Sequence, residues 1–221
     1  ACKAKGIPYV TNVQGLGTAF EKPVLSSVVS VMYRSALRKA GTVFFENEEN
    51  AQFFLHKNII SARQMKVLPG AGINLNEYPY VPMKNDGVCS FLFVGRIMKE
   101  KGVDEFFAAA KTIKAEFGEK VAFDVVGFYE DAYKEAVDQL VDDGVINFHG
   151  FQTDVHPFYE AADCVVLPSY HEGMSNVLLE GAATGRALIT SDIPGCHEAG
   201  GRCQRLSLPR AGCRSADEFL P

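Results

Sequence analysis

Short apolar runs alternate with helical stretches along most of the chain. The apolar runs are continuous, a pattern typical of strands buried on both faces of a parallel sheet. The expected strands are Tyr9–Val13, Thr42–Glu46, Lys66–Leu68, Ser90–Gly95, Ala122–Val126, Val145–His149, Cys164–Leu167 and Ala187–Thr190. The expected helices are Val24–Ala40, Glu48–Lys57, Val103–Phe117, Asp131–Asp142, Val155–Ala161 and Ser175–Thr184. This alternation predicts an α/β fold with parallel sheets covered on both faces.

A polar segment with two prolines, NEYPYVPMKNDG at residues 76–87, interrupts this alternation and predicts a linker. We therefore expect one domain over residues 1–75 and a second over residues 88–199. The second contains five β-α steps, consistent with a doubly wound sheet. The first contains only about three strands, too few for such a sheet, so we expect it to be a partial domain that is truncated on its N-terminal side.

Composition excludes several function classes. The formal net charge of the 221 residues is −5, which argues against nucleic acid as the main partner. Arg34, Arg38 and Lys39 cluster on one expected helix, and we interpret them as a solvated helix face. No apolar stretch is long enough to span a membrane. The six cysteines form no C-x-x-C pair and have no zinc-ligand spacing with histidine. We expect a soluble, cytoplasmic protein without a metal site.

Two glutamates separated by seven residues mark the stretch LPSYHEGMSNVLLE, residues 167–180. Glu172 lies on the loop after an expected strand, and Glu180 lies within the helix that follows. Ser175 or Asn176 stands at the helix start, where free backbone N–H groups bind anions. The arrangement suits a ligand that carries both phosphates and hydroxyls, with Glu180 reaching toward a ribose diol. A glycosidase acid/base pair is a weaker reading, because sequence spacing does not place two carboxylates at the required separation.

A second stretch, FLFVGRIMKEKGVD at residues 91–104, reads as a strand, a glycine turn with cations, and a helix. Ligands of open parallel sheets bind beyond the carboxyl ends of the strands, where the strand order reverses. Arg96 and Lys101 would stand at that edge, where they suit a diphosphate. The spacing is not that of a P-loop. His149 is interpreted as a structural histidine at the core edge, whereas a ligand-facing role of His171 stays open.

These motifs, with DIPGCHE at residues 192–198, resemble the retaining glycosyltransferases of family 4. The resemblance runs from about Tyr9 to Glu198, and bacterial enzymes that build lipid-linked, capsular or lipopolysaccharide glycans are the most similar group. It implies a GT-B fold: a Rossmann-like, doubly wound C-terminal domain and a partial N-terminal Rossmann-like domain.

The resemblance also implies roles for single residues. Those carried over as catalytic are Arg96 and Lys101, which bind the diphosphate, and Glu172, near the hydroxyls of the donor sugar. Glu180 would bind the ribose hydroxyls, and Phe151 lies where the family places the nucleobase. The other donor-binding residues are Gly95, His171, Gly173, Met174, Ser175 and Asn176. Neither glutamate is expected to be a nucleophile, and the nucleotide sugar is a substrate, so no cofactor is expected.

The chain departs from the family pattern at two places. Many relatives have a histidine where Gln14 stands. After Glu198 the family continues with a V-x-D-G-x-N-G-F-L type strand, whereas residues 201–209 read GRCQRLSLP. One choice of codons for this peptide, shifted by one base, encodes DGVNGFLC. We therefore hypothesise a frameshift near residues 199–201 and a non-native tail over residues 200–221.

The expected activity is transfer of a hexose or N-acetylhexosamine from a UDP-sugar to a glycan or lipid-linked acceptor, with retention. Such a step belongs to cell-surface polysaccharide biosynthesis, with peripheral contact at the inner face of the membrane. Two alternatives to this activity stay open. One is a catalytically inactive remnant that binds nucleotide sugars, and the other is a GT-B-like UDP-sugar epimerase.

Overall fold

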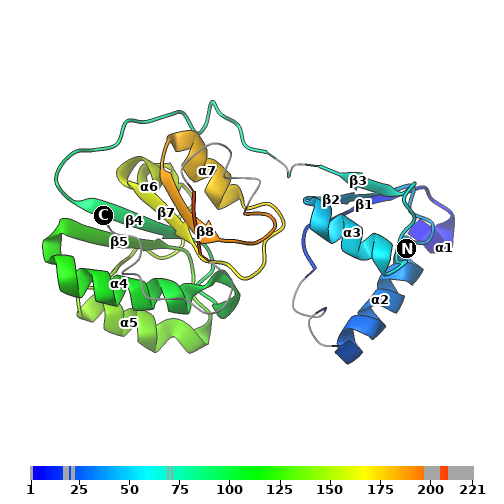
Figure 1. Cartoon of the computed structure of the whole chain (residues 1–221), viewed down its shortest axis with the longest axis horizontal. Coiled ribbons are helices and arrows are strands. Elements are labelled where there is room, and N and C mark those ends of the chain that lie inside the picture. Colours follow the sequence, from blue (N-terminus) through cyan, green and yellow to red (C-terminus); the bar gives the residue numbers. More distant parts are fainter. Residues whose placement is uncertain are drawn as a thin grey trace. The chain divides into compact units, whose positions relative to one another are not determined.

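The computed structural model describes residues 2–16, 20, 23–68, 70, 72–196 and 205–208. The chain forms two compact units (Figure 1). The first unit comprises Ala1–Gly72 and His171–Ser175, and the second comprises Ile73–Tyr170 and Asn176–Pro221. Each unit contains one parallel sheet with helices packed against it, so the predicted α/β fold is confirmed.

The sheet of the first unit has three parallel strands in the order β1 (Val10–Val13), β2 (Thr42–Phe45) and β3 (Met65–Val67). Helix α2 (Pro23–Leu37) leads from β1 to β2, and α3 (Glu48–His56) leads from β2 to β3. A short helix that the sequence did not predict, α1 (Cys2–Lys5), precedes them. Helix α2 ends three residues earlier than predicted, because the N–H of Ala40 turns back to the carbonyl of Leu37.

Local sequence explains where α3 begins. The side chain of Asn47 accepts a hydrogen bond from the backbone N–H of Asn50 at 2.9 Å and so caps the helix. Glu48 and Glu49 occupy the first turn, where negative charge interacts favourably with the helix dipole. Phe54, on the buried face of α3, lies edge-on to Phe45 of β2 and completes the small core of this unit.

The sheet of the second unit has six parallel strands. Their order is β6 (Asn147–Phe148), β5 (Val121–Val126), β4 (Cys89–Val94), β7 (Cys164–Leu167), β8 (Ala187–Ser191) and β9 (Arg205–Leu208). The chain builds outward from β4 to β6 and then returns to add β7 on the other side of β4. This is the doubly wound order of a Rossmann-like domain, with its switch point between β4 and β7.

Among the described residues of this unit, four helices cover the sheet (Figure 1): α4 (Val103–Phe117), α5 (Lys134–Asp142), α6 (His156–Ala161) and α7 (Asn176–Thr184). Helices α4 and α5 lie on one face, and α6 and α7 on the other. Three 3-10 turns accompany them: η2 (Lys99–Lys101), η3 (Gly118–Lys120) and η4 (Asp131–Tyr133). The helix predicted from Asp131 therefore begins as a 3-10 turn. Buried strand residues such as Leu92, Phe93 and Val165 explain the continuous apolar runs.

Residues of the predicted linker pack along the second unit. Arg186 is buried, and its guanidinium donates to the carbonyl of Ala162 at 2.7 Å and to that of Val81. The N–H of Val81 in turn donates to the carbonyl of Thr184 at 3.1 Å. A Cβ at Gly185 would lie 2.5 Å from the ring of Tyr80. The segment around residues 80–81 is thus held to the loop between α7 and β8.

Most of the tail hypothesised to be non-native lies outside the described residues. Residues 205–208 form β9, a strand that the sequence did not predict, and pair in parallel with β8 from Leu188↔Arg205 to Ser191↔Leu208. The third motif of the resemblance is described as far as Cys196, and His197 and Glu198 lie outside the described residues.

Candidate functional site

The loops after β4 and β7 touch at the switch point of the second unit. Gly102 has a φ of +68°, and a Cβ at this position would lie 2.0 Å from the carbonyl oxygen of Pro168. The N–H of Tyr170 donates to the carbonyl of Glu100 at 2.9 Å, and its hydroxyl donates to Glu105. The predicted edge therefore exists: the segments 95–102 and 168–170 lie together beyond neighbouring strands.

Arg96 and Lys101 both belong to this edge. Arg96 follows Gly95 directly after β4, and its side chain is exposed. Lys101 is the last residue of η2 and immediately precedes Gly102, which opens α4; its side chain is half-buried. The β4–α4 loop thus places two cations at the carboxyl edge of the sheet.

A glycine follows each of the first three strands of the second unit. The N–H of Gly95 donates to the carbonyl of Val126 at 2.9 Å, and the N–H of Gly127 donates to that of Gly150 at 2.8 Å. Gly127 has a φ of +144°, and a Cβ there would lie 1.9 Å from the carbonyl oxygen of Gly95. There is no room for a side chain at Gly127, so the backbone of these glycines lines this part of the sheet edge. We did not predict a role for Gly127, although the repeated apolar run followed by glycine was visible in the sequence.

Glu180 on α7 is held by tyrosine hydroxyls. The hydroxyl of Tyr159, a fully buried residue of α6, donates to Oε2 of Glu180 at 2.7 Å. Tyr78 lies beside the same carboxylate: burial, the charge of Glu180 and a hydrogen bond to it raise the pKa of Tyr78 to about 12. Burial, followed by the charge of Glu180, also raises the pKa of Tyr159. Both tyrosines therefore stay protonated donors at neutral pH.

This network leaves Glu180 able to bind a further ligand. A carboxylate offers about four lone-pair positions, so two tyrosine donors do not exhaust it. The ring of Tyr78 also stacks on His156 at 4.3 Å, and Nδ1 of His156 lies 2.6 Å from Asp154. These tyrosine partners could not be predicted, because no local sequence pattern distinguishes a tyrosine that orients a carboxylate from one that fills a core.

The residues His171–Ser175 belong to the first unit and make polar contacts within it. The carbonyl of Gly173 accepts a hydrogen bond from Nδ2 of Asn47 at 3.0 Å, and the N–H of Met174 donates to Oε2 of Glu46 at 3.1 Å. A Cβ at Gly173 would lie 1.8 Å from the carbonyl oxygen of Gln14. Sequence reasoning missed Glu46 and Asn47, which are more than 120 residues away along the chain.

The remaining predicted residues around this loop are placed as follows. His171 and Glu172 are half-buried, and Ser175 is buried directly before α7. Asn176 is exposed and is the first residue of α7, one residue later than the predicted helix start. The position of Ser175 before the first helical residue is that of an N-cap.

Two exposed phenylalanines stand where β5 and β6 end. Phe128 follows Gly127, and Phe151 follows Gly150; their ring centroids are 6.5 Å apart. Phe151 is 67% exposed and Phe128 is 51% exposed. Paired apolar rings left open to solvent at a ligand-binding edge are candidates for stacking on a flat ligand group. Phe151 was predicted for this role, and Phe128 was not.

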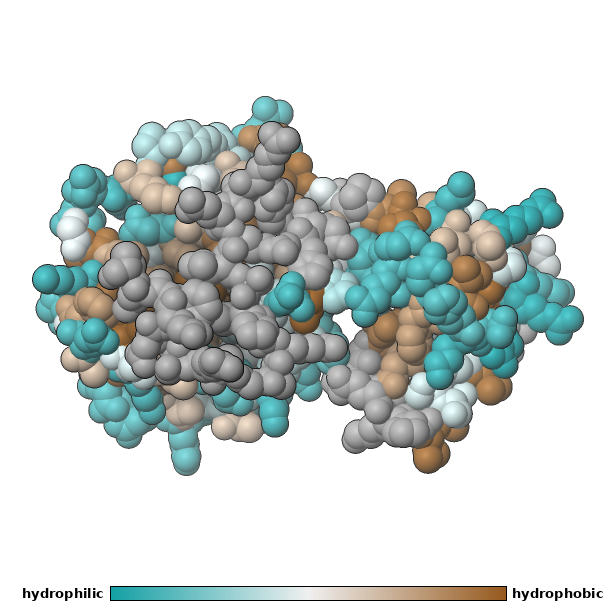
Figure 2. All heavy atoms as spheres, viewed as in Figure 1, coloured by the Kyte–Doolittle hydropathy of each residue, from teal (hydrophilic) through white to brown (hydrophobic). Residues whose placement is uncertain are grey.

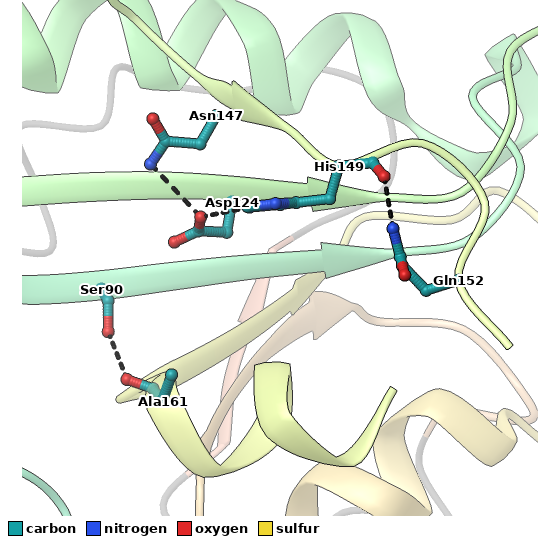
Figure 3. Close-up of polar contacts among 6 residues, drawn as sticks. All are labelled: Ser90, Asp124, Asn147, His149, Gln152 and Ala161. Carbon is teal, nitrogen blue, oxygen red and sulfur yellow. Dashed lines mark hydrogen bonds and ion pairs between the residues drawn. The ribbon is translucent and has the colours of Figure 1, made fainter. Parts of the chain in front are cut away.

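His149 has the structural role that the sequence suggested (Figure 3). Its Nε2 lies 2.7 Å from Oδ1 of Asp124 on β5, and the same oxygen accepts from Nδ2 of Asn147 at 3.2 Å. The carbonyl of His149 accepts from Nε2 of Gln152 at 2.6 Å. These bonds lie on both sides of the turn at Gly150 and tie the segment that carries Phe151 to the edge of the sheet.

None of the helices in the described residues combines the length and apolar character needed to cross a membrane. Within the same ranges, no group of three or more His, Cys, Asp or Glu side chains is arranged to hold a metal ion.

Comparison with known proteins identifies the family. The family model described as "Glycosyl transferases group 1" matches residues 89–212, more than half of the chain. The N,N'-diacetylbacillosaminyl-diphospho-undecaprenol alpha-1,3-N-acetylgalactosaminyltransferase of Campylobacter jejuni is 28% identical over 217 residues, which cover 90% of this chain and 56% of the relative. The lipopolysaccharide core biosynthesis glycosyltransferase LpsD of Rhizobium meliloti is 32% identical over 106 residues, covering 46% of this chain and 29% of that protein. The matched regions thus span 56% and 29% of the lengths of these two relatives.

Solved structures agree on the fold. Anabaena HepE, in complex with UDP-glucose, superposes with a TM-score of 0.72 at 18% identity, covering 89% of this chain and 57% of that one. WaaG, a glycosyltransferase involved in lipopolysaccharide biosynthesis, superposes with a TM-score of 0.72 at 21% identity, covering 91% and 61%. Together with the switch-point site, these matches confirm the predicted GT-B type of α/β fold. The chain belongs to the glycosyl transferases group 1 family.

Proposed function

We propose that the carboxyl edge of the second unit binds a UDP-sugar, and that the protein transfers its sugar to a glycan or lipid-linked acceptor with retention, as a family 4 enzyme. The observation that carries this proposal is the contact of the β4–α4 and β7–α7 loops at the switch point, where Gly102 packs closely against the backbone of Pro168. Doubly wound sheets bind their ligands at such a crevice. The nucleotide sugar is the substrate, and the reaction needs no further cofactor.

The diphosphate would lie over the β4–α4 loop. Arg96 and Lys101 supply positive charge there, and such charge stabilises a leaving diphosphate as negative charge develops on it during glycosyl transfer. The glycine edge at Gly95 and Gly127 keeps side chains away, so that the ligand can approach the backbone closely. Removing either cation would therefore slow transfer and weaken the binding of UDP.

The nucleoside would lie between Glu180 and the phenylalanines. Glu180 accepts hydrogen bonds from the ribose hydroxyls, while Tyr159 fixes the position of its carboxylate at 2.7 Å. The exposed rings of Phe151 and Phe128 provide an apolar surface for the base. Structures of HepE in complex with UDP and with UDP-glucose support a uridine nucleotide as the donor.

Residues of the loop before α7 would face the transferred sugar. In this proposal Glu172 and His171 contact hydroxyls of the donor sugar, and Gly173, Met174, Ser175 and Asn176 line the donor. The name of the Campylobacter relative, a transferase acting on an undecaprenol-linked diphosphate sugar, supports a lipid-linked acceptor. A lipid-linked acceptor implies peripheral contact of a cytoplasmic enzyme with the inner face of the membrane, as in capsule or lipopolysaccharide assembly.

Calorimetric titration with UDP tests the donor site. Glu180→Gln keeps an acceptor for Tyr159 but removes the charge that binds the ribose, and a hydrogen bond to a charged group contributes about 1.5–3 kcal/mol. We expect UDP affinity to fall by about 10-fold to 150-fold. Glu135→Gln, an exposed carboxylate on α5, serves as the matched control and should leave affinity unchanged. Equal affinities for the two variants would show that Glu180 does not bind the nucleotide.

Product analysis then separates transfer from the alternatives. Incubation of a UDP-sugar with a lipid-linked acceptor should give a new glycosidic bond that keeps the anomeric configuration of the donor. Formation of an isomeric UDP-sugar without acceptor would identify an epimerase instead. UDP binding without any product in the presence of suitable acceptors would identify a binding remnant.

A further inference from the structure

Two acidic residues, Asp104 and Glu105, occupy the first turn of α4. Negative charge at this end of a helix interacts favourably with the helix dipole, and charged residues are ordinary at a protein surface. Figure 2 shows hydrophilic residues in teal over much of the visible surface away from the grey residues. The exposed side chain of Asp104 fits this general explanation. Glu105 does not fit it, because its side chain is half-buried and contacts the β7–α7 loop.

The carboxylate of Glu105 depends on a single tyrosine. Its Oε1 accepts a hydrogen bond from the hydroxyl of Tyr170, and its Oε2 is buried and accepts no hydrogen bond from any described residue. Among the described residues, Tyr170 is therefore the only hydrogen-bond donor to this carboxylate. Withdrawing a charged group from water costs free energy unless hydrogen bonds compensate. The dipole of α4 alone does not require this burial, so the contact with Tyr170 calls for another explanation.

Tyr170 belongs to the contact between the two loops at the switch point. Its backbone N–H donates to the carbonyl of Glu100 at 2.9 Å. Two residues before it, the carbonyl of Pro168 lies close against Gly102. The hydroxyl adds a side-chain bond to these backbone contacts and reaches past the β4–α4 loop to α4 itself. The bond between Tyr170 and Glu105 thus fixes the start of the β7–α7 loop relative to the β4–α4 loop.

We propose that Glu105 and Tyr170 are positioning residues for the diphosphate of the nucleotide donor. Their hydrogen bond sets the separation of the two loops at the edge where Arg96 and Lys101 supply positive charge. A carboxylate in this turn repels a diphosphate through space, so Glu105 favours binding through the position of Tyr170 and not through its charge. This role rests on the proposed function, because it presupposes a diphosphate at that edge.

Calorimetric titration of the full chain with UDP and with uridine tests this role. Uridine lacks the diphosphate, so the ratio of UDP affinity to uridine affinity measures what the diphosphate contributes. Tyr170→Phe keeps the ring and leaves the carboxylate of Glu105 without a donor among the described residues. We expect the ratio to fall by about threefold to tenfold, with uridine affinity unchanged. A general loss of stability would lower both affinities equally and leave the ratio unchanged.

Variants of Glu105 separate its position from its charge. Glu105→Gln keeps a carbonyl oxygen that accepts from the hydroxyl of Tyr170, so the affinity ratio should stay at or above the wild-type value. Glu105→Ala removes the acceptor and should lower the ratio about as much as Tyr170→Phe. Combining Glu105→Ala with Tyr170→Phe should cost no more than either change alone, because both remove the same hydrogen bond. If Glu105 acted only through its charge, both of its variants would raise the ratio.

Helix α4 supplies a matched control one residue away. The hydroxyl of Tyr133 donates to Asp104 at 3.4 Å, so Tyr133→Phe and Asp104→Ala remove a tyrosine–carboxylate contact from the same helix turn. Tyr133 belongs to η4, which follows β5, and not to a loop that meets the β4–α4 loop at the switch point. Neither control variant should lower the ratio of UDP affinity to uridine affinity.

Hydrogen exchange without ligand gives a second measurement. The backbone amides of Ser169 and Tyr170 should exchange faster in Tyr170→Phe than in the wild type, and at the wild-type rate in Tyr133→Phe. Three results would overturn the positioning role alone while the wild type prefers UDP: an unchanged affinity ratio in Tyr170→Phe, an equal fall in the control variants, or unchanged exchange of these two amides in Tyr170→Phe. A wild type that binds UDP no more tightly than uridine would refute the diphosphate site and the positioning role together.

Discussion

Replacement of Tyr159 by phenylalanine probes how the carboxylate of Glu180 is held in place. The hydroxyl of Tyr159 is fully buried and donates to Glu180 at 2.7 Å, a short distance that is typical of a hydrogen bond to a charged acceptor. Tyr159→Phe keeps the ring and its packing and removes only this bond. A hydrogen bond to a charged group contributes about 1.5–3 kcal/mol, so we expect the free energy of unfolding to fall by about that amount.

Urea unfolding followed by circular dichroism measures the loss. Tyr133→Phe is the matched control, since the hydroxyl of Tyr133 lies 3.4 Å from Asp104 at an exposed site and should contribute less than about 1 kcal/mol. A double-mutant cycle with Glu180→Gln should show a coupling of at least about 1 kcal/mol between the two positions. If Tyr159→Phe costs no more than Tyr133→Phe, or if the cycle is additive, the tyrosine does not anchor the carboxylate.

Three further predictions follow from single contacts. Gly102→Ala should lower the free energy of unfolding by about 1–3 kcal/mol more than Gly144→Ala in urea titrations: both glycines have a φ of +68°, but only at Gly102 would the new Cβ collide with a carbonyl. Cys164 should escape iodoacetamide at pH 8 and react only after unfolding, as mass spectrometry would show, because burial raises the pKa of its thiol to about 12. The contribution of Tyr78 to stability should be complete below pH 10 and disappear between about pH 10 and 12, since its pKa in the folded chain lies above the ordinary value of a phenol. Melting curves recorded across this pH range should therefore show a smaller loss of stability in Tyr78→Phe than in the wild type.

Each of these has a clear contrary outcome. Equal costs for the two glycine variants would mean that the loops after β4 and β7 do not touch. Labelling of Cys164 in the folded chain at the rate of the exposed Cys2 would contradict its burial. An alkaline melting profile that Tyr78→Phe leaves unchanged would remove Tyr78 from the Glu180 network.

Sequence patterns predicted the fold well because burial on both faces leaves a simple signal. The runs around Leu92 and Val165 contain few polar residues, since helices cover both sides of these strands. The same reasoning placed Arg96 and Lys101 at the carboxyl edge, because each follows closely on a recognisable strand. The observed ends of some helices differ from the predicted ends by a few residues, because local hydrogen bonds determine where a helix stops, as at the end of α2 near Leu37.

Partners that are distant in the sequence could not be predicted in this way. Tyr159 and Glu180 lie on different helices and are 21 residues apart, and nothing in either local pattern indicates their hydrogen bond. The approach of Gly102 to Pro168 depends on the close meeting of two loops, which only the folded sheet order brings about.

Hydrogen exchange with and without saturating UDP tests the donor site most directly. We expect slower exchange of backbone amides in residues 95–102, in residues 168–170, which meet them at the switch point, and in residues 176–180, with exchange in α5 unchanged as an internal reference. Uridine, which lacks the diphosphate, should protect the region around Glu180 but not residues 95–102. Protection confined to other parts of the chain, or none at a UDP concentration that saturates binding, would contradict the central claim.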